Sequence, residues 1–179
     1  MELIKAKSSV CEDAPTFILK IPLKIKNLKK DISPEGIQLY LKDEFHITLL
    51  GNENGKFLLN YLKKLNLSKN EIKKFYSNIE KDINEILKKT KITPINNFYF
   101  LKKNYNREKK ETRYSLIQIV KTNLIKKFFK LLKKRGVKIN FDFPEPHITL
   151  YKQKENAGIG LNKKEDLEKY SVKRFNRIS

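Results

Sequence analysis

The sequence predicts an α+β fold made of two pseudo-symmetric lobes, with antiparallel sheets facing a central cleft and helices on the outside. Two observations favour this fold. Segments with strand alternation and segments with helical periodicity follow one another along the 179 residues. In addition, the tetrapeptide His46-Ile47-Thr48-Leu49 occurs again, unchanged, as His147-Ile148-Thr149-Leu150. Each half of the chain thus supplies strands, one main helix and one copy of the tetrapeptide.

The length suits one domain over residues 1–179, in which residues 1–15 form a lead-in with little structure. Alternating apolar residues predict three strands in the first half of the chain. These strands are residues 16–25, with a break or sheet edge at Pro22, residues 37–41, and residues 45–50. A turn region is expected over residues 26–36, and a loop over residues 52–55 ends this group of strands.

Two helices are expected next. Apolar residues at helical spacing predict a short helix over residues 57–65. Ser68 and Glu71 have the spacing of a capping box, in which each side chain satisfies a backbone N–H of the other residue. The apolar stripe after this box predicts a long amphipathic helix to about Lys89.

The second half is expected to repeat this plan. Strands over residues 98–102 and 114–120 are expected to pair and to flank a charged loop, residues 104–112, which could be a hairpin tip. A helix then begins after Thr122 or Asn123 and ends at Gly136, because glycine readily takes the left-handed conformation that ends helices. The second tetrapeptide strand follows Pro144 and Pro146, and after it come a loop over residues 153–164 and a last strand before Arg177.

The tetrapeptides contain the only two histidines of the chain. Side chains alternate between the two faces of a strand, so His46 and Thr48 point one way while Ile47 and Leu49 point the other. The same alternation puts His147, Thr149 and Tyr151 on one face. Two such strands would line a cleft with two imidazoles and two hydroxyls.

These residue types suit phosphodiester cleavage, which needs one proton removed from the attacking oxygen and another delivered to the leaving oxygen. Neutral imidazole is a good base and imidazolium a good acid, because the unperturbed pKa is about 6.5. His46 and His147 are therefore the candidate catalytic pair, in either order of roles. Thr48 and Thr149 could donate to the non-bridging oxygens, and Tyr151 could stack on a base or simply pack on its neighbours.

The net charge of +20 favours a polyanionic partner such as RNA or a small oligonucleotide, although a low-GC genome also produces lysine-rich chains. Cys11 is the only cysteine, so neither a disulfide framework nor a cysteine zinc site is expected. Neither tetrapeptide brings a carboxylate at ligand spacing, which predicts a protein without metal or cofactor. With no signal-peptide pattern and no long apolar run, we expect a cytoplasmic monomer that does not enter membranes.

The two motifs resemble those of the two-histidine (2H) phosphoesterase superfamily, which carries paired H-x-[ST]-hydrophobic motifs on duplicated α+β lobes. Residues 45–51 resemble its first motif, and the run from Gly136 through Phe143-Pro144-Glu145-Pro146 to Leu150 resembles its second. The resemblance spans residues 16 to about 177. It implies metal-independent phosphodiester cleavage by His46 and His147.

The resemblance suggests the opening of a terminal 2′,3′-cyclic phosphate on RNA as the first choice of reaction. An alternative is degradation of a signalling nucleotide, either 2′-5′ oligoadenylate or a cyclic oligonucleotide. A third hypothesis is a basic RNA-binding module that keeps the cleft but does not catalyse. Long RNA gripped by many lysines should lose affinity steeply with salt, and a di- or trinucleotide much less.

Overall fold

A computed structural model describes residues 7–9, 16–21, 28–106, 110–138, 143–154 and 157–178. The strands in these residues are β1 (Lys7–Ser9), β2 (Thr16–Ile21), β3 (Asp31–Ile32), β4 (Leu39–Leu41), β5 (Phe45–Leu50), β6 (Thr93–Asn106), β7 (Lys110–Lys121), β8 (His147–Lys152) and β9 (Ser171–Phe175). The helices are α1 (Asn52–Lys64), α2 (Lys69–Lys88), α3 (Leu124–Lys134) and α4 (Asp166–Tyr170), with a short 3₁₀ turn at Pro34–Gly36. The α+β class is confirmed.

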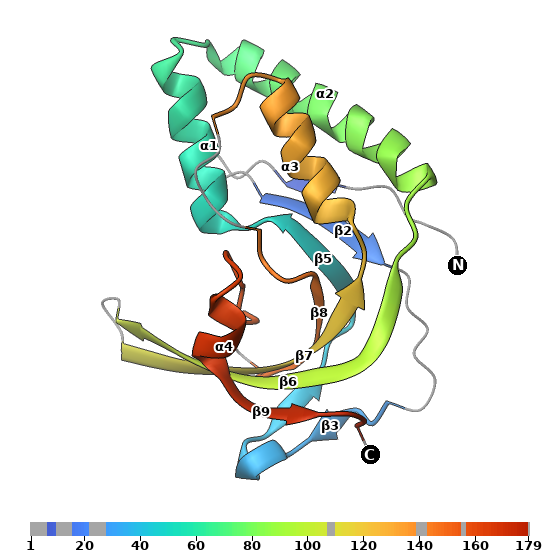
Figure 1. The fold of residues 1–179 in the computed structure, drawn as a ribbon. Coiled ribbons are helices and arrows are strands. Elements are labelled where there is room, and N and C mark those ends of the chain that lie inside the picture. Colours follow the sequence, from blue (N-terminus) through green and yellow to red (C-terminus); the bar gives the residue numbers. More distant parts are fainter. Residues whose placement is uncertain are drawn as a thin grey trace.

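The described strands form a single curled, antiparallel sheet in the order β1-β2-β5-β8-β7-β6-β9. β4 pairs with β8 next to β5, and β3 pairs with β4. Figure 1 shows α1, α2 and α3 grouped on one side of the sheet and α4 within its curl. The two strands that carry the tetrapeptides, β5 and β8, are neighbours near the middle of this order.

The main core fills the space between the three longer helices and one face of the sheet. The apolar stripe of α2 recurs every three to four residues, so one side of the helix is buried. Its buried members are Ile72, Tyr76, Ile79, Ile83 and Leu87. They join Ile47 and Leu49 of β5 and Ile148 and Leu150 of β8 in one cluster. The apolar face of each tetrapeptide therefore anchors its strand in the core.

A smaller apolar cluster lies on the opposite face of the sheet. Ile117 and Ile119 of β7 and Leu101 of β6 pack there against Ile159 and Leu161. β7 takes part in both clusters because its side chains alternate, with Leu116 on the main-core side. The chain after β8 thus covers part of the sheet face that the long helices leave open.

Several local predictions are confirmed. Ser68 and Glu71 form the capping box of α2, with the Ser68 backbone N–H donating to Glu71 Oε2 over 2.8 Å. The described part of the predicted 16–25 strand is β2, and the expected break at Pro22 lies outside the described residues. Gly136 follows α3 with a φ of +84°, the left-handed conformation expected of a residue that ends a helix.

One prediction about loops was wrong, that for residues 52–55, and two others were wrong only in part. The lead-in contains β1, because residues 7–9 pair with β2. The predicted loop over residues 52–55 is the first turn of α1, where Gly55 N–H donates to Gly51 O. The charged residues 104–112 largely extend the β6–β7 hairpin, apart from residues 107–109, which lie outside the described residues. Thr112 donates to Asn104 across this hairpin and Arg113 pairs with Glu111 along β7, so polar contacts stabilise the exposed ribbon.

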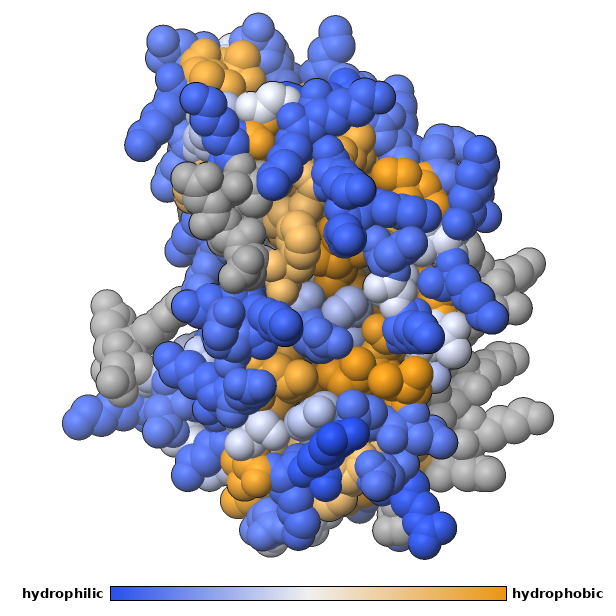
Figure 2. Space-filling view, in the orientation of Figure 1, coloured by the Kyte–Doolittle hydropathy of each residue, from blue (hydrophilic) through white to orange (hydrophobic). Residues whose placement is uncertain are grey.

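The face drawn in Figure 2 is mostly hydrophilic, with smaller apolar areas between the polar side chains. The large apolar side chains that are exposed come from scattered elements, and include Tyr40, Phe57, Leu65, Phe143 and Val172. Within the described residues, no helix is both long enough and apolar enough to cross a membrane.

Candidate active site

The two tetrapeptide strands pair with each other. β5 and β8 are antiparallel, and Ile47 lies opposite Ile148, with both side chains fully buried in the main core. Because the two strands run in opposite directions, this register places His46 opposite Thr149 and Thr48 opposite His147. Side chains directly opposite in such pairs have Cβ atoms about 4.5–5.5 Å apart. Both histidines and both threonines therefore share one face of the sheet, the face turned away from the main core.

The His147 ring is held in a defined orientation. Its Nδ1 lies 2.8 Å from the carbonyl oxygen of Glu145, so Nδ1–H donates there and Nε2 is left as the basic nitrogen. The residue is only 7% exposed. Burial lowers the pKa of His147 below its usual range; the Glu145 hydrogen bond opposes this effect in part, and the charge of Lys42 adds to it. His147 is therefore neutral near pH 7.

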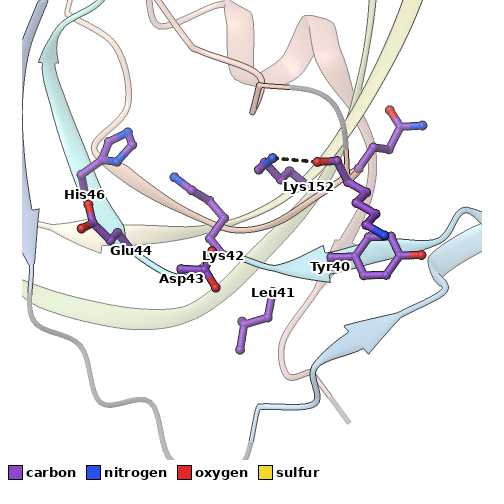
Figure 3. Close-up of a pocket in the computed structure, with 9 residues that line it drawn as sticks. Tyr40, Leu41, Lys42, Asp43, Glu44, His46 and Lys152 are labelled. Carbon is purple, nitrogen blue, oxygen red and sulfur yellow. Dashed lines mark hydrogen bonds between the residues drawn. The ribbon is translucent and has the colours of Figure 1, made fainter.

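His46 is more accessible than His147 and opens onto a pocket of about 650 Å³. The pocket is lined from β4, the turn before β5, and the end of β8 (Figure 3). Besides His46, its lining includes Tyr40, Lys42, Asp43, Glu44, Lys152 and Gln153. A volume in this range suits a nucleotide-sized ligand.

Tyr151 does not share the cleft face, so that prediction was wrong. Its side chain is fully buried in the main core, and its hydroxyl donates to the Lys29 carbonyl over 3.1 Å. The reason is an irregularity in the β7–β8 ladder, where Ile117 pairs with Thr149 but Leu116 pairs with Tyr151. Leu150 is the extra residue of this bulge, and the alternation of side chains shifts by one position beyond it.

The bulge and the pairing of β4 with β8 together bring to the site three residues that the sequence did not indicate. Lys152 takes the face that simple alternation assigned to Tyr151, and Tyr40 lies opposite it on β4. Lys42 follows two residues after Tyr40, and its backbone N–H donates to Leu150 O, which keeps it in line with the sheet. The position of Lys42 four residues before His46 was the only available signal, and it is weak in a lysine-rich chain.

Residues 157–162 are held against the sheet by contacts with β7 and α1. The Ile159 N–H donates to Ser115 Oγ of β7 over 3.1 Å, and Asn54 of α1 donates to the Asn162 carbonyl over 3.1 Å. Gly158, next to the Ile159 anchor, packs against Thr149, since a Cβ built on Gly158 would lie 3.1 Å from Thr149 Cγ2. This close approach leaves little free space on that side of Thr149.

The described residues contain no group of three or more His, Cys, Asp or Glu side chains that could hold a metal ion. Metal independence stays a prediction, which a chelator experiment decides. Comparison of the chain with protein-family models, with curated proteins and with solved structures found no match. The proposed function therefore depends on the geometry of the site.

Proposed function

We propose that this protein is a metal-independent phosphodiesterase that cleaves an RNA or oligonucleotide phosphodiester, with the opening of a terminal 2′,3′-cyclic phosphate as the preferred reaction. The observation that carries the proposal is the pairing of Ile47 with Ile148, which brings two identical His-x-Thr segments side by side in opposite directions. Such an arrangement presents one imidazole and one hydroxyl from each side to a single phosphate.

In this proposal the chain has the two-lobe plan of a 2H phosphoesterase, with the lobes meeting where β5 pairs with β8. One lobe would contain β2 and β5, and the other β6, β7 and β8. The antiparallel pairing of β5 with β8 supports a pseudo-twofold relation between the lobes, because an antiparallel pair of identical segments is itself nearly symmetric.

His147 is proposed as the base and His46 as the acid when water opens a cyclic phosphate. The lowered pKa of His147 and its Nδ1–H bond to Glu145 leave a neutral ring with Nε2 able to accept a proton. His46 would then protonate the leaving oxygen from the other side of phosphorus. In the balanced reaction, water adds to phosphorus, one ribose P–O bond breaks, and a phosphate monoester with a free hydroxyl results.

Thr48 and Thr149 would donate to the two non-bridging oxygens and hold the phosphate in line between the histidines. Tyr40 lines the pocket beside His46 and is 38% exposed, so its ring is available to stack on a base in the place first expected for Tyr151.

The test is hydrolysis in EDTA of a panel of four substrates by the wild type and by the double variant His46→Ala/His147→Ala. The panel contains an RNA ending in a 2′,3′-cyclic phosphate, 2′-5′ oligoadenylate, 3′-5′ oligoadenylate and a cyclic dinucleotide. We expect turnover of the cyclic-phosphate RNA in EDTA, and turnover at least about 10³-fold slower by the double variant. Turnover of 2′-5′ oligoadenylate or the cyclic dinucleotide alone would move the substrate to signalling nucleotides, and binding without turnover would favour a non-catalytic RNA-binding module.

Gly158→Ala tests the role of Thr149 without changing any residue that would contact the phosphate. The new methyl group would lie 3.1 Å from Thr149 Cγ2 and 3.5 Å from its Oγ1, so Thr149 must move by a few tenths of an ångström. We expect kcat to fall about tenfold, because small displacements of positioning groups are expensive in catalysis. Gly160→Ala is the matched control, since a Cβ there meets nothing within 4 Å. Equal activity of the two variants would contradict a positioning role for Thr149.

A further inference from the structure

Two lysines, Lys42 directly after β4 and Lys152 of β8, line the pocket beside His46. Tyr40 and Lys152 are paired across β4 and β8, and Lys42 lies on the same side of the sheet as Tyr40 because two residues separate equivalent positions in a strand. In Figure 3 the Lys42 and Lys152 side chains lie between those of His46 and Tyr40, and the Lys42 chain extends toward His46. Lys152 Nζ also donates to the Lys154 carbonyl over 3.3 Å, which holds it at the pocket wall.

This arrangement concentrates positive charge in a partly desolvated place. The pKa of Lys42 is lowered chiefly by burial and further by the charge of Lys152, with Glu44 opposing both effects. Among the described residues no carboxylate forms an ion pair with Lys42. Asp43 and Glu44 also line the pocket, but a half-buried ammonium with a second ammonium nearby favours a ligand that carries negative charge.

We propose that Lys42 and Lys152 form a subsite for a second phosphate group of the substrate, separate from the phosphate held between His46 and His147. The proposal rests on the proposed function, because it takes the scissile phosphate to lie between the histidines. The catalytic groups lie on β5 and β8 near Ile47 and Ile148, whereas Lys152 lies farther along β8, beyond the Leu150 bulge. Lys42 lies beside Leu150 on the β4 side and extends toward His46, so it would contact the nucleotide between the two phosphate positions. One phosphate would therefore lie at each end of a bound nucleotide.

The substrate class follows from the presence of two phosphate positions. A nucleoside 2′,3′-cyclic phosphate has a single phosphate and would leave the subsite empty. A nucleotide with a 2′,3′-cyclic phosphate and a 5′-phosphate, whether free or joined to a preceding nucleotide, would occupy both positions, with its base within reach of Tyr40. The subsite thus selects the terminal nucleotide of a chain, or its 5′-phosphorylated form, over the isolated cyclic nucleoside phosphate.

The test compares two product analogues that differ only in the 5′-phosphate. Binding of adenosine 3′-monophosphate and adenosine 3′,5′-bisphosphate, and of the corresponding 2′ isomers, is measured by titration calorimetry. We expect the 5′-phosphate to lower Kd about tenfold in the wild type, as is typical of a charge-assisted contact. The gain should disappear in Lys42→Met and in Lys152→Met, which keep the length of the side chain but remove its charge. Lys130→Met, an exposed lysine of α3, is the matched control for net charge and should keep the gain.

A gain of the same size in all four proteins would overturn the subsite, because it would arise from the overall positive charge. No gain in the wild type would overturn it as well. Circular dichroism of both pocket variants shows that any loss is not due to unfolding, and agreement between two independent variants guards against a local distortion by one. This outcome can be told apart from that of the hydrolysis panel. If no substrate is hydrolysed, the 5′-phosphate can still lower Kd in the wild type and not in the two lysine variants. If a substrate is hydrolysed, the 5′-phosphate can still leave Kd unchanged.

Discussion

Replacing either His46 or His147 with alanine is expected to lower kcat by about 10³-fold, within the range by which general acid–base catalysis accelerates proton transfer. Each histidine would serve a different proton, so neither can compensate for the other. The double variant should be little worse than either single variant, since the two groups act as a unit on one phosphate. The measurement is single-substrate kinetics on whichever member of the panel the wild type hydrolyses.

His147→Asn separates catalysis from structure at this position. The Asn side-chain N–H₂ can take the place of Nδ1–H and donate to the Glu145 carbonyl, which is the structural hydrogen bond of His147. It has no basic nitrogen in the position of Nε2. We expect His147→Asn to retain the thermal stability of the wild type and to lose activity as His147→Ala does. Substantial activity in His147→Asn would show that His147 only supports the strand.

The pH profile gives a further check on the assignment of roles. A base must be unprotonated to act, and burial lowers the pKa of His147. In the pH profile of kcat/KM, the midpoint on the acidic side should therefore lie below the usual imidazole pKa of about 6.5, and activity should persist into mildly acidic solution. Lys42→Met removes a positive charge that disfavours protonation of His147. The midpoint on the acidic side of the profile should therefore move to higher pH in that variant. A flat profile between about pH 5 and 8 would contradict the mechanism.

Local signals in the sequence predicted the elements that hold the site. The capping box at Ser68 and Glu71, the stripe of α2 and the glycine after α3 depend on contacts between near neighbours in the chain, and each was found as expected. The duplicated tetrapeptide likewise indicated which strand faces are apolar, because Ile47 and Ile148 must be buried for either strand to join a core.

The sequence could not indicate the departures from regular alternation. The bulge at Leu150 exchanges the positions of Tyr151 and Lys152 relative to the sheet, and nothing in the run from Thr149 to Lys152 marks it. The burial of Tyr151 depends on a hydrogen bond to Lys29, a residue distant in sequence. The pairing of β4 with β8, which brings Lys42 to the site, is equally non-local. Register between distant strands is set by the assembled core, and short patterns do not contain it.

Ile148→Ala is expected to have the largest effect on stability among these variants, and to affect activity as well. Ile148 is fully buried and forms the register pair that joins the two tetrapeptide strands. Truncation of a buried isoleucine leaves a cavity and destabilises a protein by about 2–5 kcal/mol. Chemical denaturation followed by circular dichroism measures the loss. Because the side chain lies on the core face, any loss of activity in the folded variant must act through the position of the strands.

Ile79→Ala in α2 is the control, since Ile79 is fully buried in the same core cluster but lies on a helix rather than on β5 or β8. Both variants should lose similar stability, so kinetics at a low temperature where both remain folded compares their sites directly. We expect Ile79→Ala to keep the kcat of the wild type and Ile148→Ala to lose about tenfold or more, because a shift of about 1 Å between reacting groups can reduce rates about 100-fold. Equal activity in the two variants would mean that the contact between Ile47 and Ile148 does not set the distance between the histidines. The proposed function would then lose the observation on which it mainly depends.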